Sequence, residues 1–166
     1  MNFANRTSSV LPLGASVLAM AAALTVQYAL GWKPCELCLI QRIPILLAGL
    51  VAMGSFYPCQ SEIPRRFLVI LAALLFALAS TIAAYHVGVE QHWWLYEGGC
   101  SRDPEAAQGA VDFTAALSQP VVVRCDQPVW QWHGLTLAGI NVVYSGAVAL
   151  LTVLRLKAEW NGKGAV

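Results

Sequence analysis

Four long apolar stretches constrain the fold of this 166-residue chain more than any other feature of its sequence. A helix needs about 20 predominantly apolar residues to cross the hydrocarbon core of a bilayer. Stretches close to this length lie at residues 10–30, 39–57, 67–85 and 135–154, and the third contains no charged residue. The sequence therefore predicts an all-α membrane protein, a single four-helix transmembrane bundle over residues 1–166.

The overall composition supports a lipid environment. Hydrophobic residues make up 58% of the chain and charged residues only 11%, against about 25% charged residues in ordinary soluble domains. The formal net charge of +1 excludes the clustered basic face expected of a nucleic-acid-binding protein. The first stretch resembles a signal peptide in its alanine content, but it is too long and three more follow. We therefore expect a multi-pass protein in the lipid bilayer and no nucleic-acid partner.

The distribution of lysine and arginine predicts the orientation. Positive residues concentrate on the cytoplasmic side of membrane proteins. Both termini are therefore predicted to be cytoplasmic, with outer loops at about 31–38 and 87–134. The second loop is rich in glycine and proline, which predicts a mostly irregular structure, with a short surface helix possible at 106–117. Six of the ten basic residues lie on the side assigned to the cytoplasm: Arg6, Arg65, Arg66, Arg155, Lys157 and Lys163.

Four of the five cysteines fall in the predicted outer loops. Cys35 and Cys38 form a C-x-x-C in the first loop, and Cys100 and Cys125 lie apart in the second, whereas Cys59 lies at the inner end of the second stretch. Two thiols at a helix start can close a small ring, and the free N–H groups there favour a thiolate. The four outer cysteines could also bind zinc, and the loop pair could be a structural disulfide. The outer location favours oxidation over metal binding.

The segment from Pro34 to Arg42, PCELCLIQR, carries a resemblance to a known family. With the four stretches and the separated cysteine pair, it resembles the DsbB-type disulfide-bond formation proteins, quinone reductases of the bacterial inner membrane. The resemblance covers nearly the whole chain. It implies an oxidoreductase that reoxidises a periplasmic DsbA-type thiol oxidase and passes the electrons to a membrane quinone, ubiquinone or menaquinone. Vitamin K epoxide reductase relatives carry the two cysteine pairs in the reverse order.

The resemblance also implies roles for individual residues. Cys100 would form the mixed disulfide with the DsbA-type partner, Cys125 would pair with Cys35, and Cys38 would pass electrons to the quinone. Arg42 lies four residues after Cys38, so the two share a helix face. We expect Arg42 to stabilise the Cys38 thiolate and bind a quinone oxygen; the alternative is an anchor in the lipid headgroups.

His86 matches the family's histidine in the dipeptide Tyr85-His86. The resemblance implies that it donates a proton to the reduced quinone or holds a quinone carbonyl; the alternative is a hydrated interfacial histidine. Trp130 is expected to anchor the membrane interface or to lie near the cysteines. No metal motif is expected among the histidines, and Cys59 is expected to be dispensable. The alternative function is a non-enzymatic membrane protein that is stapled by disulfides or binds a metal.

Overall fold

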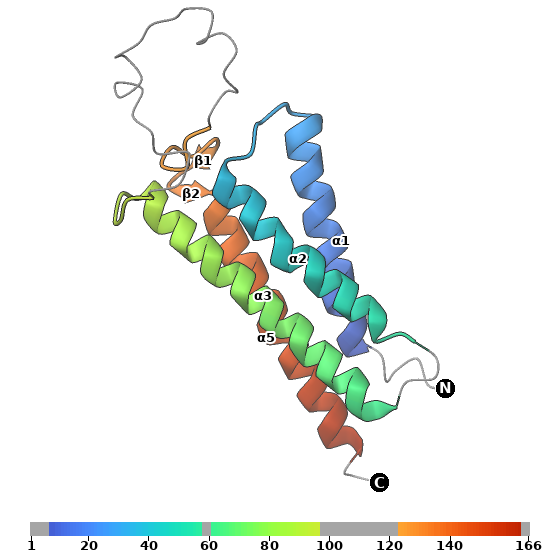
Figure 1. The fold of residues 1–166 in the computed structure, drawn as a ribbon. Coiled ribbons are helices and arrows are strands. Elements are labelled where there is room, and N and C mark those ends of the chain that lie inside the picture. The colour runs from blue at the N-terminus through green and yellow to red at the C-terminus, as the bar shows by residue number, and fades with distance from the viewer. Residues whose placement is uncertain (1–6, 58–60, 97–122, 164–166) are drawn as a thin grey trace, which may run out of the picture.

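The protein is a bundle of four long helices. The computed structural model describes residues 7–57, 61–96 and 123–163. Its helices are α1 (Thr7–Tyr28), α2 (Glu36–Gly54), α3 (Glu62–Glu90) and α5 (Leu137–Lys163), and Figure 1 shows them side by side in an elongated bundle. All four are long and apolar enough to cross a membrane. The predicted four-helix membrane bundle is thus confirmed.

Small residues fill the interior of the bundle. Alanines lie where helices meet, so that the backbones approach closely, as helix packing in membranes requires. Leucines such as Leu46, Leu50 and Leu74 point outward instead, and each is about half exposed, consistent with contact to lipid. The helices pack most extensively as the pairs α3–α5 and α2–α3. The central buried cluster consists of Ala15, Ile45, Ala48, Ala52, Ala72, Phe76, Ala79 and Val148.

Glycine 49 permits the closest approach between α1 and α2. A Cβ atom at Gly49 would lie 2.8 Å from the Cβ atom of Ser16, closer than such atoms come. Ser16 cannot easily give way, because its hydroxyl donates to the carbonyl of Ile45 at 2.9 Å. This contact therefore fixes the separation of α1 and α2, whose connection carries Cys35.

We expect Gly49→Ala to destabilise the bundle by about 1–3 kcal/mol, because the extra methyl group must push the helices apart. Gly14 is the matched control: it is also helical, yet nothing lies within 4 Å of a Cβ placed there. Gly14→Ala should be neutral or stabilise by about 0.5–1 kcal/mol. Unfolding of both variants in detergent micelles measures the difference. Equal stabilities would contradict the packing assigned to Gly49.

Helix α3 extends beyond the apolar stretch at both ends. It begins at Glu62 and ends at Glu90, whereas the sequence predicted 67–85. At its start, Arg65 is buried and donates to the hydroxyl of Ser8 and to the carboxylates of Glu62 and Glu159. These partners satisfy polar groups that hydropathy alone assigns to a loop. They also hold the start of α1 and the end of α5 at one end of the bundle (Figure 1).

A short hairpin precedes α5 at the opposite end. Strands β1 (Gln131–Trp132) and β2 (Leu135–Thr136) pair antiparallel. The two residues between them, His133 and Gly134, both have positive φ, which fits the two-residue turns of hairpins. The sequence had assigned Leu135 to the fourth apolar stretch, but α5 begins only at Leu137. The predicted surface helix at 106–117 lies outside the described residues, which resume at Val123.

Candidate functional site

Cys35 and Cys38 lie at the N-terminus of α2. Cys35 is the N-cap residue, and its sulfur accepts a hydrogen bond from the backbone N–H of Cys38 at 3.4 Å. Its thiol donates to the Cys38 sulfur, with 3.0 Å between the two sulfur atoms. This hydrogen bond, together with burial, raises the pKa of Cys35 to about 12. Cys35 therefore stays protonated at neutral pH, while the Cys38 sulfur accepts the hydrogen bond of its thiol, which suits a thiolate at Cys38.

His86 lies beside this thiol pair. Its Nε2 atom is 3.6 Å from the Cys35 sulfur, and its Nδ1 atom is 2.8 Å from the side-chain amide of Gln41. The ring also makes a hydrogen bond with the backbone of Cys125. Only 3% of His86 is exposed, so these contacts, rather than water, determine the orientation of the ring.

Cys125 belongs to the same buried cluster as Cys35. Leu37 and Val89 complete the cluster, and Cys38, Ile40, Tyr96 and Val123 pack against it. Cys35 and Cys38 are thiols in the structure, since their sulfur atoms lie 3.0 Å apart and no disulfide joins them. Three of the four predicted redox cysteines are thus brought together, although Cys125 is far from the other two in the sequence. Cys100, the fourth, and Cys59 lie outside the described residues.

Cys125 is flanked by a charged pair. Arg124 donates two hydrogen bonds to the carboxylate of Asp126, at 3.0 and 2.6 Å. This guanidinium holds the pKa of Asp126 below its ordinary value. The pair is partly exposed, so it fixes the backbone around Cys125 locally and adds little to the stability of the whole protein.

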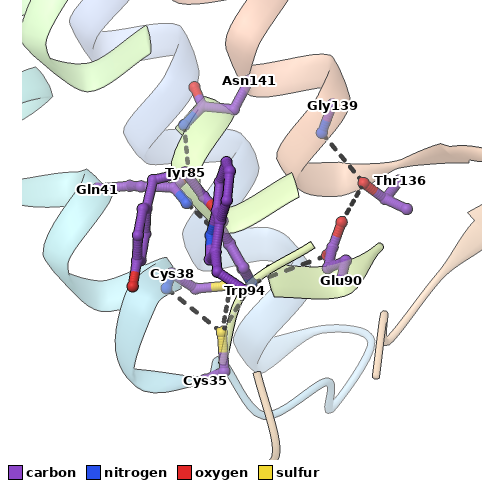
Figure 2. A network of polar contacts seen from close by, with 10 residues as sticks. Cys35, Cys38, Gln41, Tyr85, Glu90, Trp94, Thr136, Gly139 and Asn141 are labelled. Atoms are coloured by element: carbon purple, nitrogen blue, oxygen red, sulfur yellow. Dashed lines mark hydrogen bonds and ion pairs between the residues drawn. The ribbon is translucent and has the colours of Figure 1, made fainter. Parts of the chain in front are cut away.

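A chain of side-chain amides leads from His86 into α5. Gln41 accepts a hydrogen bond from Asn141 at 2.6 Å, and Asn141 in turn accepts one from the hydroxyl of Ser145 at 2.9 Å. Figure 2 shows Gln41 and Asn141 pointing toward each other from α2 and α5. Polar side chains inside a membrane bundle are costly unless they are paired, and they usually serve a function.

A buried carboxylate lies one helical turn after His86. Glu90 accepts a hydrogen bond from Thr136 at 2.6 Å, and its other oxygen lies 3.8 Å from Nε2 of His86. Thr136 also caps α5, because its hydroxyl oxygen accepts a hydrogen bond from the N–H of Gly139 at 3.1 Å. Figure 2 shows Thr136 between Glu90 and Gly139. The hairpin and the start of α5 therefore hold Glu90 in place beside the histidine.

The segment after α3 folds back over the helix turns that carry His86 and Glu90. The indole of Trp94 donates to the carbonyl of Tyr85 at 3.0 Å, and the two rings stack with centroids 5.5 Å apart. A Cβ at Gly88 would overlap the Trp94 ring. Glycine at position 88 is therefore what allows this aromatic pair to lie flat against the helix.

A cavity of about 390 Å³ opens beside the thiol pair, between α1, α2 and α5. Cys38 and Arg42 both line it, as do Gln41 and Asn141, and the rest of its wall is mostly apolar. Arg42 reaches across to α1, where it donates to the side-chain carbonyl of Gln27 at 2.6 Å. The apolar residues on the α1 side are Leu18, Ala19, Met20, Ala22, Ala23 and Val26.

This cavity fits a quinone. Sites for small flat ligands of this size are mainly apolar, with a few polar groups that fix the orientation. The guanidinium of Arg42 and the amides of Gln41 and Asn141 provide donors for ring oxygens, and the Cys38 sulfur lies in the same wall. His86 is not among the residues that line the cavity; Gln41 lies between them.

The remaining sequence candidates lie around this end of the bundle. Trp130 is half buried, and His92 and His133 are exposed residues in turns with positive φ. Sequence reasoning did not single out Gln41, Glu90 or Asn141. The sequence nevertheless contains a signal for each of them. Gln41 is a polar residue next to Arg42, Glu90 is an acid four residues after His86, and Asn141 is an amide inside the fourth apolar stretch.

The grouping of Cys35, Cys38 and His86 would also be compatible with metal binding. The ligand atoms of Cys35, Cys38 and His86 all lie within 4.8 Å of one another, close enough to hold a metal ion. A structural zinc site is normally closed by four ligands. Within the described part of the chain, only these three side chains form such a group.

Comparison with known proteins gives one consistent result. A family model described as disulfide bond formation protein DsbB matches residues 5–155. Disulfide bond formation protein B of Acinetobacter baumannii is 32% identical over 166 residues, covering 94% of this chain and 93% of its own. The protein of that name from Chromohalobacter salexigens is 38% identical over 86 residues, 51% of this chain and 50% of its own. No solved structure matches significantly. The chain belongs to the DsbB family of disulfide bond formation proteins.

Proposed function

We propose that this protein reoxidises a periplasmic DsbA-type thiol oxidase and passes the electrons to a membrane quinone. Membership of the DsbB family implies an oxidoreductase, and the family generally uses quinone. The observation that carries the proposal is that Cys38 belongs both to the thiol pair and to the wall of the cavity. Electrons that reach this sulfur need no further carrier to reach a ligand in the cavity.

In this proposal the cysteines act in sequence. Cys100 exchanges disulfides with the partner, Cys125 then attacks Cys35, and Cys38 is released as the leaving thiolate. The shared burial of Cys35 and Cys125 supports the middle step. The thiolate is favoured at Cys38 by its place in the first turn of α2. Bound ubiquinone or menaquinone supplies a two-electron acceptor, and Arg42 would hold one of its oxygens.

The proposed location is the bacterial inner membrane, with both termini cytoplasmic and the cysteine loops periplasmic. The start of α1 and the end of α5 share one end of the bundle, and the thiol pair lies at the other. Alkaline phosphatase fused after Gly109 should therefore be active, because that enzyme folds only in an oxidising compartment. A fusion after Lys163 should be inactive. The opposite pattern would overturn the orientation.

The direct test of the proposed function is an assay of the purified protein with reduced DsbA-type oxidase and a short-chain ubiquinone. We expect quinol to form and the partner to become oxidised in equal amounts. Quinol formation without the partner's oxidation, or neither, would overturn the proposal.

The alternative of a metal-binding membrane protein is favoured by one observation, the close grouping of Cys35, Cys38 and His86. The proposed redox function requires both sulfur atoms to be free for disulfide exchange. We therefore expect less than one zinc ion per ten chains in protein purified without chelators, measured by mass spectrometry of the metal. One zinc ion per chain would favour the alternative.

A further inference from the structure

We propose that His86 is the base that accepts the proton of Cys35 when the Cys35–Cys38 disulfide closes, and that Gln41 and Glu90 position its ring for this role. The proposal rests on the proposed function, since it concerns how the same thiol pair becomes oxidised. It assigns His86 to the thiol chemistry, whereas the family resemblance implied contact with the quinone.

Closing the disulfide requires a proton acceptor. When the pair is oxidised, the S–H bond of Cys35 breaks and an S–S bond to Cys38 forms. The electron pair leaves through the Cys38 sulfur, and a bound quinone would accept it together with two protons, one from Cys35 by way of the base and one from water. Cys35 is buried, with 3% of its surface exposed, and its pKa is about 12. Burial disfavours the unassisted ionisation of this thiol, so closing the disulfide at neutral pH needs a base close to Cys35.

His86 is placed to take this proton. Its Nε2 atom lies 3.6 Å from the Cys35 sulfur, within the range of hydrogen bonds to sulfur. In the structure the thiol donates instead to the Cys38 sulfur. That acceptor is lost once the electrons of Cys38 are withdrawn. His86 is a base that already lies within hydrogen-bonding distance of the Cys35 sulfur.

The amide chain fits both protonation states of the ring. When the Gln41 amide donates to Nδ1, the ring hydrogen lies on Nε2. If the amides of Gln41 and Asn141 both rotate by half a turn, oxygen and nitrogen exchange places at the same distances. Gln41 then accepts from Nδ1–H, and Nε2 is free to accept a proton. The chain ends at the hydroxyl of Ser145, which can donate or accept.

This arrangement parallels the cysteine proteases, in which an amide oxygen orients the catalytic histidine. Gln41 occupies the orienting position in this protein. A thiol, a base within reach of it and a third group behind the base are the signature of an activated nucleophile.

Glu90 balances the charge that the ring acquires. Its carboxylate lies 3.8 Å from Nε2, is almost fully buried and is held by Thr136. The other titratable groups around the ring are the thiols of Cys35, Cys38 and Cys125. The side chains that α5 contributes are uncharged amides and hydroxyls, so Glu90 is the anion that stabilises a protonated His86.

The test uses neither quinone nor partner. In the full chain with Cys59, Cys100 and Cys125 replaced by alanine, Cys38 is converted at acid pH to its methyl disulfide with methyl methanethiosulfonate. After a jump to higher pH, Cys35 attacks the Cys38 sulfur, the new S–S bond forms, and methanethiolate leaves. Mass spectrometry follows the loss of the methylthio group, and the rate is measured as a function of pH.

We expect His86→Asn to slow this closure at pH 7 by about 10²–10⁴-fold, the usual contribution of general base catalysis. The rate of that variant should keep rising tenfold per pH unit as hydroxide ionises Cys35, whereas the parent rate should level off. His92→Asn is the matched control, since His92 is exposed and its positive φ suits asparagine; its rate should equal the parent's. Equal rates for His86→Asn and the parent at pH 7 would overturn the proposal.

Two substitutions at Gln41 separate positioning from packing. Gln41→Glu keeps an oxygen that can accept from Nδ1–H, whereas Gln41→Leu removes it. Closure should remain within about threefold of the parent rate in the glutamate variant and fall at least tenfold in the leucine variant. A purely structural role in this apolar bundle predicts the reverse order, because leucine is the better fit.

Glu90→Gln should slow closure about tenfold, because the protonated ring loses its stabilising charge. An unchanged rate would remove Glu90 from the assignment. The proposed function stays testable by the quinone assay whatever this experiment gives.

Discussion

Replacing Cys38 with serine is expected to abolish quinone reduction by the reduced partner, lowering the rate by about 10⁴-fold or more. Among the three cysteines that the structure describes, Cys38 alone both pairs with another thiol and lines the cavity. A hydroxyl group can accept the same hydrogen bonds but cannot form a disulfide or release two electrons. The measurement is the initial rate of quinol formation, with the protein reconstituted in vesicles.

Cys59→Ser is the matched control for this prediction. It makes the same change in the same protein, at a cysteine that the sequence assigns to the inner side of the membrane. Its rate should equal that of the unmodified protein, and both variants should insert normally. Turnover by Cys38→Ser at the unmodified rate would contradict the route through this sulfur.

Replacing Arg42 with leucine is expected to raise the KM for quinone by about 10–100-fold, with a smaller effect on kcat. A hydrogen bond from a charged donor contributes about 1.5–3 kcal/mol, and 1.4 kcal/mol corresponds to a factor of ten in affinity. The bond to Gln27 at 2.6 Å holds one Nη atom of Arg42 against α1. The rest of the guanidinium group can then bind an oxygen of the ligand. The KM of Arg42→Lys should lie between those of the unmodified protein and Arg42→Leu, because lysine keeps the charge but lacks the fixed fork of donors.

Arg66→Leu is the control for the arginine prediction. Arg66 lies at the opposite end of the bundle, where it pairs with Glu62 and stacks over Trp160. Its loss should leave the KM for quinone unchanged. A KM for Arg42→Leu that matches that of Arg66→Leu would show that Arg42 only anchors the helix at the interface.

The four helices could be predicted from the sequence because each apolar stretch is long enough by itself to span a bilayer. Their ends could not, since these depend on partners that are distant in the chain. Helix α3 begins at Glu62 because Ser8 and Glu159 receive the side chain of Arg65. It continues to Glu90 because Thr136 of the hairpin meets that carboxylate.

The same limit applies to the candidate site: its local features could be predicted from the sequence, but its contacts between helices could not. The spacing of Cys35 and Cys38 and the position of Arg42 one turn later are local features of a single helix. The contact between His86 and Cys35 spans 51 residues and exists only because α2 packs against α3. The cavity forms only where three helices converge. The role of polar residues that line it from α5, such as Asn141, therefore could not be predicted from the sequence.

The central claim, that the thiol pair passes its electrons to quinone, is tested most directly by adding one equivalent of ubiquinone to the fully reduced, partner-free protein. Acid quenching, alkylation of the remaining thiols and peptide mapping then report which cysteines have become oxidised. We predict a Cys35–Cys38 disulfide and one quinol formed for each disulfide. If the quinone is not reduced and both cysteines are recovered as alkylated thiols, the claim is wrong.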